Sequence, residues 1–253
     1  MKDKKPFKTY RNLSSEDRLP FTGHLEELRW RIVVVLGSIF VLFCVFYAFS
    51  EKIILELQSP IQQNLIFIAP TEAFFANLKV SSLMAIAVCT PVILHQAWGF
   101  MAPGLLEDEK KYGLPVVLGG TFCFIIGVSF AYYLVLPFGI KFLLSYATDE
   151  IKPMISVANY ISFILKMMFA FGIVFEYPLI ILILSKIGLV TSVFLSKQRK
   201  YAVLIIAVLS ALLTPPDVVS QILMILPLLV LYEISIFIAR YFGKKKPEND
   251  KSD

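Results

Sequence analysis

Residues 22–31 of this 253-residue chain have the sequence TGHLEELRWR and connect a polar amino-terminal tail to a long apolar run that begins at Ile32. Thr22 is a favourable N-cap residue, and the two leucines share one side of the turns that follow, so the stretch predicts the start of a helix. Its two arginines fall where a membrane surface would begin. The prediction therefore places Glu26 and Glu27 at a boundary between water and lipid.

The composition indicates a polytopic membrane protein of the all-α class. Apolar residues make up 57% of the chain, charged residues only 17%, and the mean hydropathy is +0.74. An ordinary soluble domain is less apolar than this. The formal net charge of +5 does not indicate nucleic-acid binding, because the basic residues gather in short segments between apolar runs, where they report topology.

Six apolar runs are candidates for transmembrane helices. The first would extend about 27 Å at about 1.5 Å per residue, but the fifth would extend only about 20 Å. Because a double proline follows the fifth run, we expect the last two helices to be short and to form a hairpin. Residues 51–73 and 185–200 are expected to be loops, and Pro137 is expected to end the third span. The expected spans are residues 32–49, 74–101, 114–136, 159–184, 201–213 and 218–239.

The distribution of lysine and arginine predicts the orientation. Nineteen of the 24 lie in the two tails and in the segments that share their side of the membrane, three lie on the other side and two lie within spans. The positive-inside rule then places both termini in the cytosol. We divide the chain into a cytosolic tail at 1–21, a six-helix membrane domain at 22–240 and a basic, polar cytosolic tail at 241–253.

The sequence offers no apparatus for catalysis. It has no glycine-rich phosphate loop, no HExxH, no GxSxG and no cysteine-rich ligand set, and His24 and His95 are its only histidines. We therefore expect neither an enzyme nor a metal or other cofactor. An intramembrane hydrolase is disfavoured for the same reason, since no pair of nucleophile and base is visible.

Two acidic clusters lie beside the membrane on a face otherwise dominated by basic residues: Glu26 with Glu27, and residues 107–109. One explanation is self-neutralisation, since Glu27 reaches Arg31 at i+4 and two lysines follow residue 109. The other is a binding site for a cationic ligand, because a guanidinium can bind a carboxylate through two parallel hydrogen bonds. Spacing alone favours neither explanation.

Three further polar residues lie in or beside apolar runs. Glu176 falls near the middle of the fourth run, where an ionisable side chain costs about 2.5 kcal/mol or more unless it faces protein or water. A functional role is favoured over a plain interhelical hydrogen bond for this residue. Thr214 and Gln221 flank the double proline and are candidates for caps or for contacts with a partner helix.

Several stretches together resemble the TatC family, the multi-spanning receptor subunits of the twin-arginine protein translocase. The resemblance extends over nearly the whole chain from Phe21 to Arg240 and preserves the order and spacing of the motifs. The stretches are HLEELRWR from His24, PVILHQAWGFMAPGLLEDEKK from Pro91, FAYYLVLP from Phe130, AFGIVFEYP from Ala170, and LLTPPDVVSQILMILPLLVLYEISIF from Leu212.

The resemblance implies six transmembrane helices in a concave, glove-like bundle in a cell inner membrane. It implies binding of twin-arginine signal peptides on the cytosolic face and export of folded proteins driven by the proton-motive force. In that family the paired arginines of the signal are recognised by glutamates that correspond to Glu27 and Glu109. Arg29, Gln96 and Phe100 are the expected neighbours of this signal-peptide site.

The same resemblance assigns the remaining polar positions. Glu176 corresponds to the family's intramembrane glutamate. The hairpin with Thr214 and Gln221 corresponds to the surface that receives single-span partner subunits of the TatA and TatB type, and we expect an oligomer in the membrane. The competing hypothesis is a proton-coupled secondary transporter of small solutes built around Glu176.

Overall fold

The computed structural model describes residues 21–59, 61, 65–104, 110–148, 153–214 and 218–243. Within these ranges the chain is helical, and the only extended pairing there is an isolated bridge between Ile66 and Ser156. The helices are α1 (Phe21–Leu57), α2 (Glu72–Met101), η1 (Ala102–Gly104), α4 (Gly113–Phe130), η2 (Ala131–Val135), α5 (Leu136–Leu144), α6 (Val157–Phe175), α7 (Tyr177–Ile187), α8 (Ser192–Lys197), α9 (Arg199–Leu213) and α10 (Val218–Phe242).

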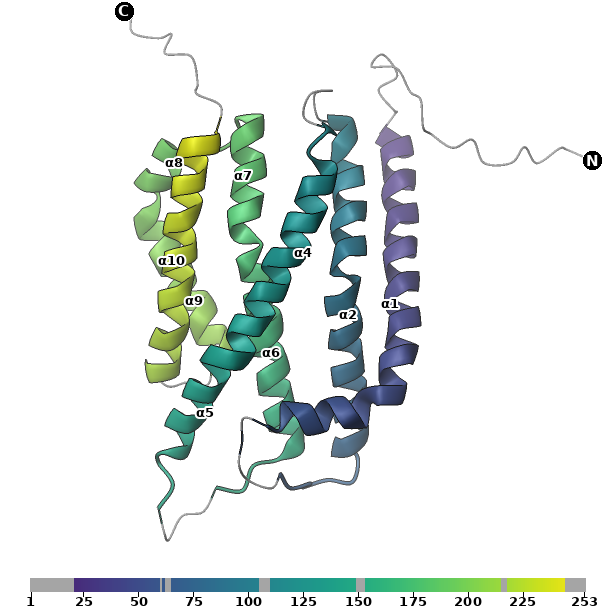
Figure 1. The fold of residues 1–253 in the computed structure, drawn as a ribbon, viewed down its shortest axis with the longest axis vertical. Helices are drawn as coiled ribbons and strands as arrows, with labels where there is room; N and C mark the ends of the chain where they lie inside the picture. The colour runs from purple at the N-terminus through teal and green to yellow at the C-terminus, as the bar shows by residue number, and fades with distance from the viewer. Residues whose placement is uncertain are drawn as a thin grey trace, which may run out of the picture.

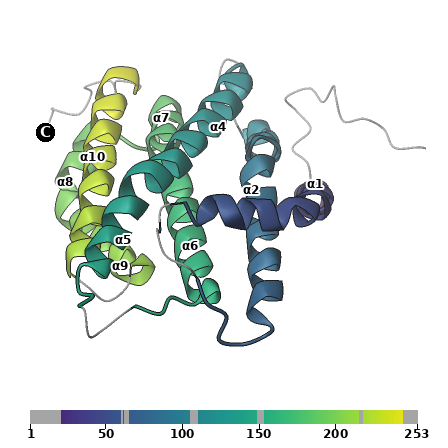
Figure 2. The ribbon, with the colours of Figure 1, turned by 60° about the horizontal axis from the view of Figure 1, so that its bottom comes forward.

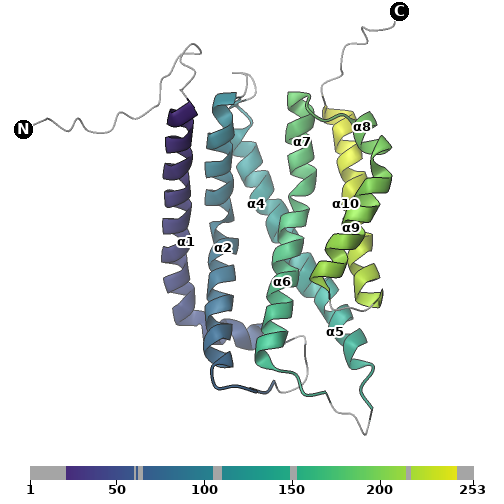
Figure 3. The same cartoon turned by 180° about the vertical axis from the view of Figure 1, so that it is seen from behind.

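The helices form an elongated bundle in which α1 and α2 lie side by side at one edge and α8, α9 and α10 lie at the other (Figure 1). Helices α4 and α5 follow one another diagonally across the front, and α6 and α7 follow one another behind them (Figures 1 and 3). Among the described residues, the helices long and apolar enough to cross a membrane cover Gly23–Ala48, Glu72–Gly104, Gly113–Leu144, Val157–Ile187 and Gln221–Phe242. The all-helical, multi-pass architecture is thus confirmed.

The first helix is longer than expected. Its apolar span ends at Ala48, but the helix continues to Leu57, so the expected loop at 51–73 is wrong in its first part. This last part turns and lies across the end of the bundle (Figures 1 and 2). The hydroxyl of Tyr160 donates to the carbonyl of Leu57 at 3.0 Å, and that of Tyr132 donates to the carbonyl of Glu56 at 3.0 Å. These bonds fasten the transverse part to the helices it crosses.

The third span does not end at Pro137. A π-helical turn, η2, follows α4, and α5 continues to Leu144 with Pro137 in its first turn. The amide of Leu136 donates to the carbonyl of Ala131, five residues back, which is the π pattern. A proline in the first turn of a helix costs little because its missing N–H would have no partner inside that helix, so the chain passes Pro137 without stopping.

The carboxyl-terminal part of the bundle departs from the expected spans in three places. The fourth span divides at Glu176 into α6 and α7, and α7 ends before Gly188, whose φ of 86° suits glycine. The expected loop at 185–200 contains α8. Helix α9 has 15 residues, about 23 Å, and is short as expected, but α10 has 25 residues and is longer than the predicted hairpin partner.

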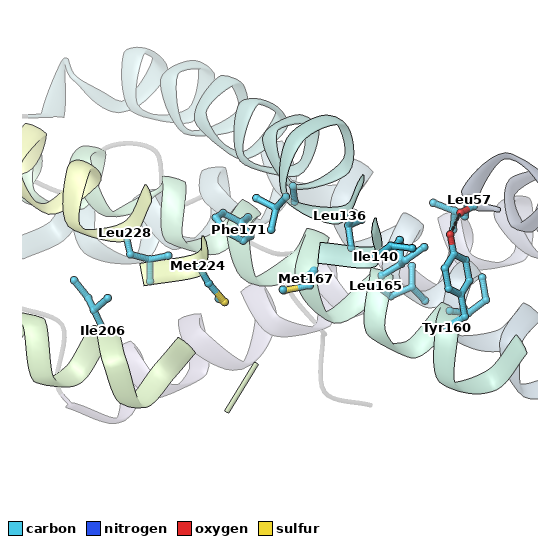
Figure 4. Packing of buried hydrophobic residues seen from close by; sticks show 14 of the residues in the cluster. Leu57, Leu136, Ile140, Tyr160, Leu165, Met167, Phe171, Ile206, Met224 and Leu228 are labelled. Carbon is cyan, nitrogen blue, oxygen red and sulfur yellow. Dashed lines mark hydrogen bonds between the residues drawn. The ribbon is translucent and has the colours of Figure 1, made fainter. Parts of the chain in front are cut away.

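The core is centred on α6, and η2, α5 and α10 are among the helices that contribute buried residues to it (Figure 4). Phe171 and Leu136 are fully buried there, as is Met224 of α10. Small residues let α4 and α6 approach closely: a Cβ at Gly127 would lie 2.5 Å from the carbonyl oxygen of Phe171. Helices in lipid gain stability from such close contact rather than from removing apolar surface from water. This contact fixes the position of the α6–α7 break relative to α4.

The described ends of the chain lie at the same end of the bundle, because α1 begins and α10 ends there (Figure 1). The end of α2, the start of α4 and the end of α7 also lie at this end, which we call the cationic end. The described lysines and arginines at this end are Arg29, Arg31, Lys110, Lys111, Lys186, Lys197, Arg199, Lys200 and Arg240. Among the other described residues, Lys52 and Lys141 lie at the opposite end, and Lys79 and Lys166 lie within the spans of α2 and α6. This is the charge distribution that the sequence predicts.

Candidate functional site

The candidate site is built from the first turns of α1 and the last turns of α2, which lie side by side at the cationic end (Figures 1 and 3). Helix α1 begins at Phe21, at the edge of the described residues, so Thr22 is the second residue of the helix and not its N-cap as expected. Residues four apart on α1 share one face, so Glu27 and Arg31 both point along the side that meets α2.

The carboxylate of Glu27 is held by Arg31, and Arg31 is in turn held by Gln96. The Nε and Nη2 groups of Arg31 both donate to Oε1 of Glu27, the Nε bond at 3.0 Å. The Nη1 group of Arg31 donates to Oε1 of Gln96 on α2 at 3.0 Å. The side chain of Glu27 is 24% exposed, so this ion pair is partly shielded from water and fixes the carboxylate in one orientation.

Two stacked aromatic rings lie beside the second oxygen of the carboxylate, Oε2. The rings of His24 and Phe100 stack at 4.2 Å with planes 14° apart, joining α1 to α2. Nδ1 of His24 lies 3.7 Å from Oε2 of Glu27, which is too long for a hydrogen bond. Among the described residues Oε2 accepts no hydrogen bond, so it is the oxygen available to a ligand.

The structure brings Gln96 and Phe100 to Glu27 but not Arg29. Arg29 is exposed and lies two residues from Glu27, on a different side of α1. Arg31 occupies the position beside the carboxylate. Glu109 and the rest of its acidic cluster, residues 107 and 108, lie outside the described residues.

Sequence reasoning missed two members of the cluster, His24 and Gly99. The spacing of His24 three residues before Glu27 is a signal that could have found the first, because i and i+3 side chains are neighbours. Gly99 matters because a Cβ there would collide with the guanidinium of Arg31. This role of Gly99 becomes visible only in the structure, where α2 packs against α1.

Glu176 lies in a different environment, at the break between α6 and α7. Glu176 is 8% exposed, and its Oε1 has no hydrogen-bond partner among the described residues. Oε2 faces α4, where a Cβ at Gly120 would lie 2.9 Å from it. The sequence reasoning placed Glu176 within a helix; the structure places it where the helix is interrupted.

Thr214 and Gln221 lie at the ends of α9 and α10 that face each other. Thr214 is buried, and its hydroxyl donates to the carbonyl of Ser210 at 2.8 Å. The side-chain amide of Gln221 donates to the carbonyl of Ala207 at 3.2 Å and ties α10 to α9. Gln221 therefore joins the two helices of the hairpin, whereas the Thr214 bond stays within the end of α9. The double proline between them lies outside the described residues.

Together these features define a multi-pass helical membrane protein with a carboxylate, a guanidinium, an amide and two stacked rings at its cationic end. Comparison with known proteins gives the family. The family model described as Sec-independent protein translocase protein (TatC) matches residues 23–227. The chain belongs to the TatC family, and its function is protein transport as a translocase component.

Two relatives and one solved structure illustrate the similarity. The chain is 45% identical to TatC of Desulforapulum autotrophicum over 93% of this chain and 90% of that protein. It is 39% identical to TatC of Aquifex aeolicus over 92% of this chain and 100% of that protein. A crystal structure of the twin-arginine translocase receptor TatC in DDM has a TM-score of 0.80 at 39% identity and covers 88% of this chain and 100% of that one. The comparisons give no support to a small-solute transporter.

Proposed function

We propose that this chain is the receptor subunit of the twin-arginine translocase and that it binds twin-arginine signal peptides through Glu27 and Glu109 at the cationic end. The single observation that carries the proposal is the geometry of Glu27. Its carboxylate is oriented by Arg31 and partly shielded from water, and its Oε2 accepts no hydrogen bond from the described residues. A guanidinium of the signal peptide suits that oxygen.

Each arginine of the signal needs its own planar acceptor, so the proposal requires two carboxylates. Glu27 is one and Glu109 is the other. Gln96 and Phe100 act beside Glu27, the first through Arg31 and the second through its stack with His24. Arg29, exposed on another side of α1, is assigned a peripheral contact with the signal peptide.

The proposal includes the orientation of the chain. The protein lies in a cell inner membrane with its cationic end facing the cytosol. Folded proteins are exported from the cytosol to the other side of this membrane, driven by the proton-motive force. The concentration of lysine and arginine at that end supports this orientation through the positive-inside rule.

We propose further that the α9–α10 hairpin receives single-span partner subunits of the TatA and TatB type and that the complex contains several copies of this chain. The exposed apolar residues along α9 and α10, such as Leu204, Val208 and Leu226, support a lipid-facing or partner-facing surface. Gln221 is half-buried, and its side-chain oxygen is the group we assign to a partner helix. Thr214 is buried, so its role is to shape the end of α9 that the partner meets.

The experiment uses photocrosslinking of a twin-arginine signal to the full-length protein in membranes. Glu27→Ala and Glu109→Ala are each expected to abolish the crosslink while the protein still inserts. Glu26→Ala is the matched control, because Glu26 is exposed and carries the same charge one residue away. Normal crosslinking in both of the first two variants would show that the assignment is wrong.

A further inference from the structure

Arg31 is the feature of the site that the proposed function leaves unexplained. A receptor for cations would bind them most strongly through an unpaired carboxylate, yet Glu27 already carries a guanidinium of its own chain. Both donors of Arg31 that reach the carboxylate bond to the same oxygen, Oε1. A carboxylate oxygen has two lone pairs, so Arg31 uses both acceptor positions of Oε1 and leaves those of Oε2.

The guanidinium of Arg31 is also fixed in place from the side of α2. Its Nη1 group donates to Gln96 at 3.0 Å, and Gly99 leaves the space that the guanidinium occupies. Any side chain at position 99 would collide with it. The pair is therefore a preorganised part of the site and not a loose surface contact.

This arrangement changes what the site can attract. With Arg31 present, the charges of Glu27 and Arg31 cancel, so a point charge gains little from approaching and is repelled by the resident cation. A guanidinium is less affected, because its charge is delocalised and its planar fork can place two N–H groups on one oxygen, as Arg31 itself does on Oε1. A lysine ammonium has no such fork.

We propose that Arg31 is a specificity-determining residue: by occupying Oε1 and neutralising Glu27, it makes the site accept arginine and reject lysine in the signal peptide. The inference rests on the proposed function. It gives Arg31 a role in choosing the ligand, although Glu27 is the group that accepts the hydrogen bonds. It assigns to Gln96 and Gly99 the role of holding Arg31 in place.

The test measures the affinities of a twin-arginine and a twin-lysine signal peptide for the purified full-length protein by fluorescence anisotropy. The measured quantity is the ratio of the two dissociation constants. Arg31→Gln removes the resident charge and is expected to lower this ratio by roughly tenfold, which corresponds to about 1.4 kcal/mol. Most of the change in the ratio should come from tighter binding of the twin-lysine peptide to Arg31→Gln. Raising the salt concentration should reduce this increase in affinity.

Two further variants test whether the positive charge at position 31 is what matters. Arg31→Lys keeps the positive charge at i+4 from Glu27 and is expected to keep most of the discrimination. Lys197→Gln removes an exposed charge of the cationic end on α8 and is expected to leave the ratio unchanged. If Arg31→Gln does not fold, Arg31→Met provides the same test, because it removes the same charge and keeps a side chain of similar length.

The outcomes distinguish the two proposals. Wild-type protein that binds neither peptide overturns the proposed function and this inference with it. Wild-type protein that prefers the twin-arginine peptide, together with an Arg31→Gln variant that keeps the same ratio, overturns the inference alone. Equal weakening of both peptides in Arg31→Gln also overturns it, since that result is expected of a residue that only supports the structure.

Discussion

Glu27 and Glu176 are both glutamates of a membrane bundle, but their surroundings differ in almost every respect. Glu27 lies at the cationic end with its side chain 24% exposed and an arginine on one oxygen. Glu176 lies at a break between two helices, is 8% exposed and has no cation on it among the described residues. The first carboxylate keeps one oxygen that accepts no hydrogen bond from the described residues, whereas the second is surrounded by the bundle.

We infer from the difference that the surroundings of each carboxylate in the bundle decide what it can do. At the boundary with water an ion pair forms at small cost, and one oxygen stays available to a soluble ligand. Inside the bundle an unpaired charge is expensive, so the group acts within the membrane domain and not on a ligand that arrives from the cytosol. Binding and bundle structure should therefore respond to different substitutions.

The largest expected effect is on binding. Glu27→Ala should weaken binding of a twin-arginine signal by roughly thirtyfold or more, since it removes charge-assisted hydrogen bonds worth about 2 kcal/mol. Glu176→Gln should change the same affinity by less than about threefold, because the group lies away from the cationic end. Titration of the purified variants by fluorescence anisotropy measures both values. Equal losses would remove the distinction between the two glutamates.

A second prediction concerns the nature of Glu176. Glu176→Gln should export cargo better than Glu176→Ala, because the amide fills the same volume and remains a polar anchor at the helix break, whereas alanine leaves a cavity. Export of a twin-arginine reporter at matched protein levels measures the difference. Equal defects in the two variants would point instead to a charge or a proton at this position.

The helix contacts around Glu176 give a third prediction. Gly120→Ala would place a methyl group 2.6 Å from Leu94, 2.9 Å from Glu176 and 3.0 Å from Leu179, so we expect a loss of about 1–3 kcal/mol in stability. Gly139→Ala is the matched control, because it is also helical and a Cβ there meets no atom within 4 Å. Thermal unfolding in detergent should rank the control at or above wild type. A stable Gly120→Ala variant would mean that Glu176 is not tightly enclosed.

The smallest effect is expected at a second ion pair of the cationic end. Arg199 donates to Glu233 at 2.8 Å, but the two side chains are 53% and 55% exposed. Such a pair contributes at most about 1 kcal/mol, so Glu233→Gln should barely change thermal stability or signal binding. A loss of signal binding as large as that of Glu27→Ala would mean that any acidic group at this end serves equally well.

The sequence was sufficient for the order of the long apolar helices, because a run of some twenty apolar residues is a direct signal of a span. Five of the six expected spans are among the helices long and apolar enough to cross a membrane, and the short α9 is not. The sequence failed where one helix continues beyond the apolar run, as in the transverse part of α1, and where a proline is accommodated. Pro137 predicts a helix end from local rules, but the π-helical turn before it is visible only in the folded chain.

For the site, the i+4 spacing offered an ion pair between Glu27 and Arg31 as one of two explanations, and the structure contains that pair. Spacing along one helix could not show that Gln96 and Gly99 of α2 hold the same guanidinium, because that depends on how two helices face each other. Arg29 was expected as a neighbour from the resemblance alone, although the i+4 spacing pointed to Arg31. The role of Glu109 remains a prediction.

The central claim is that a twin-arginine signal binds beside Glu27, and photocrosslinking from position 100 tests it most directly. A photoreactive phenylalanine analogue at Phe100 leaves both glutamates intact and keeps an aromatic ring against His24. We expect a strong crosslink to a twin-arginine signal, a much weaker one to its twin-lysine counterpart, and none to either in Glu27→Ala. Crosslinks of equal strength to both signals, unchanged by Glu27→Ala, would contradict it.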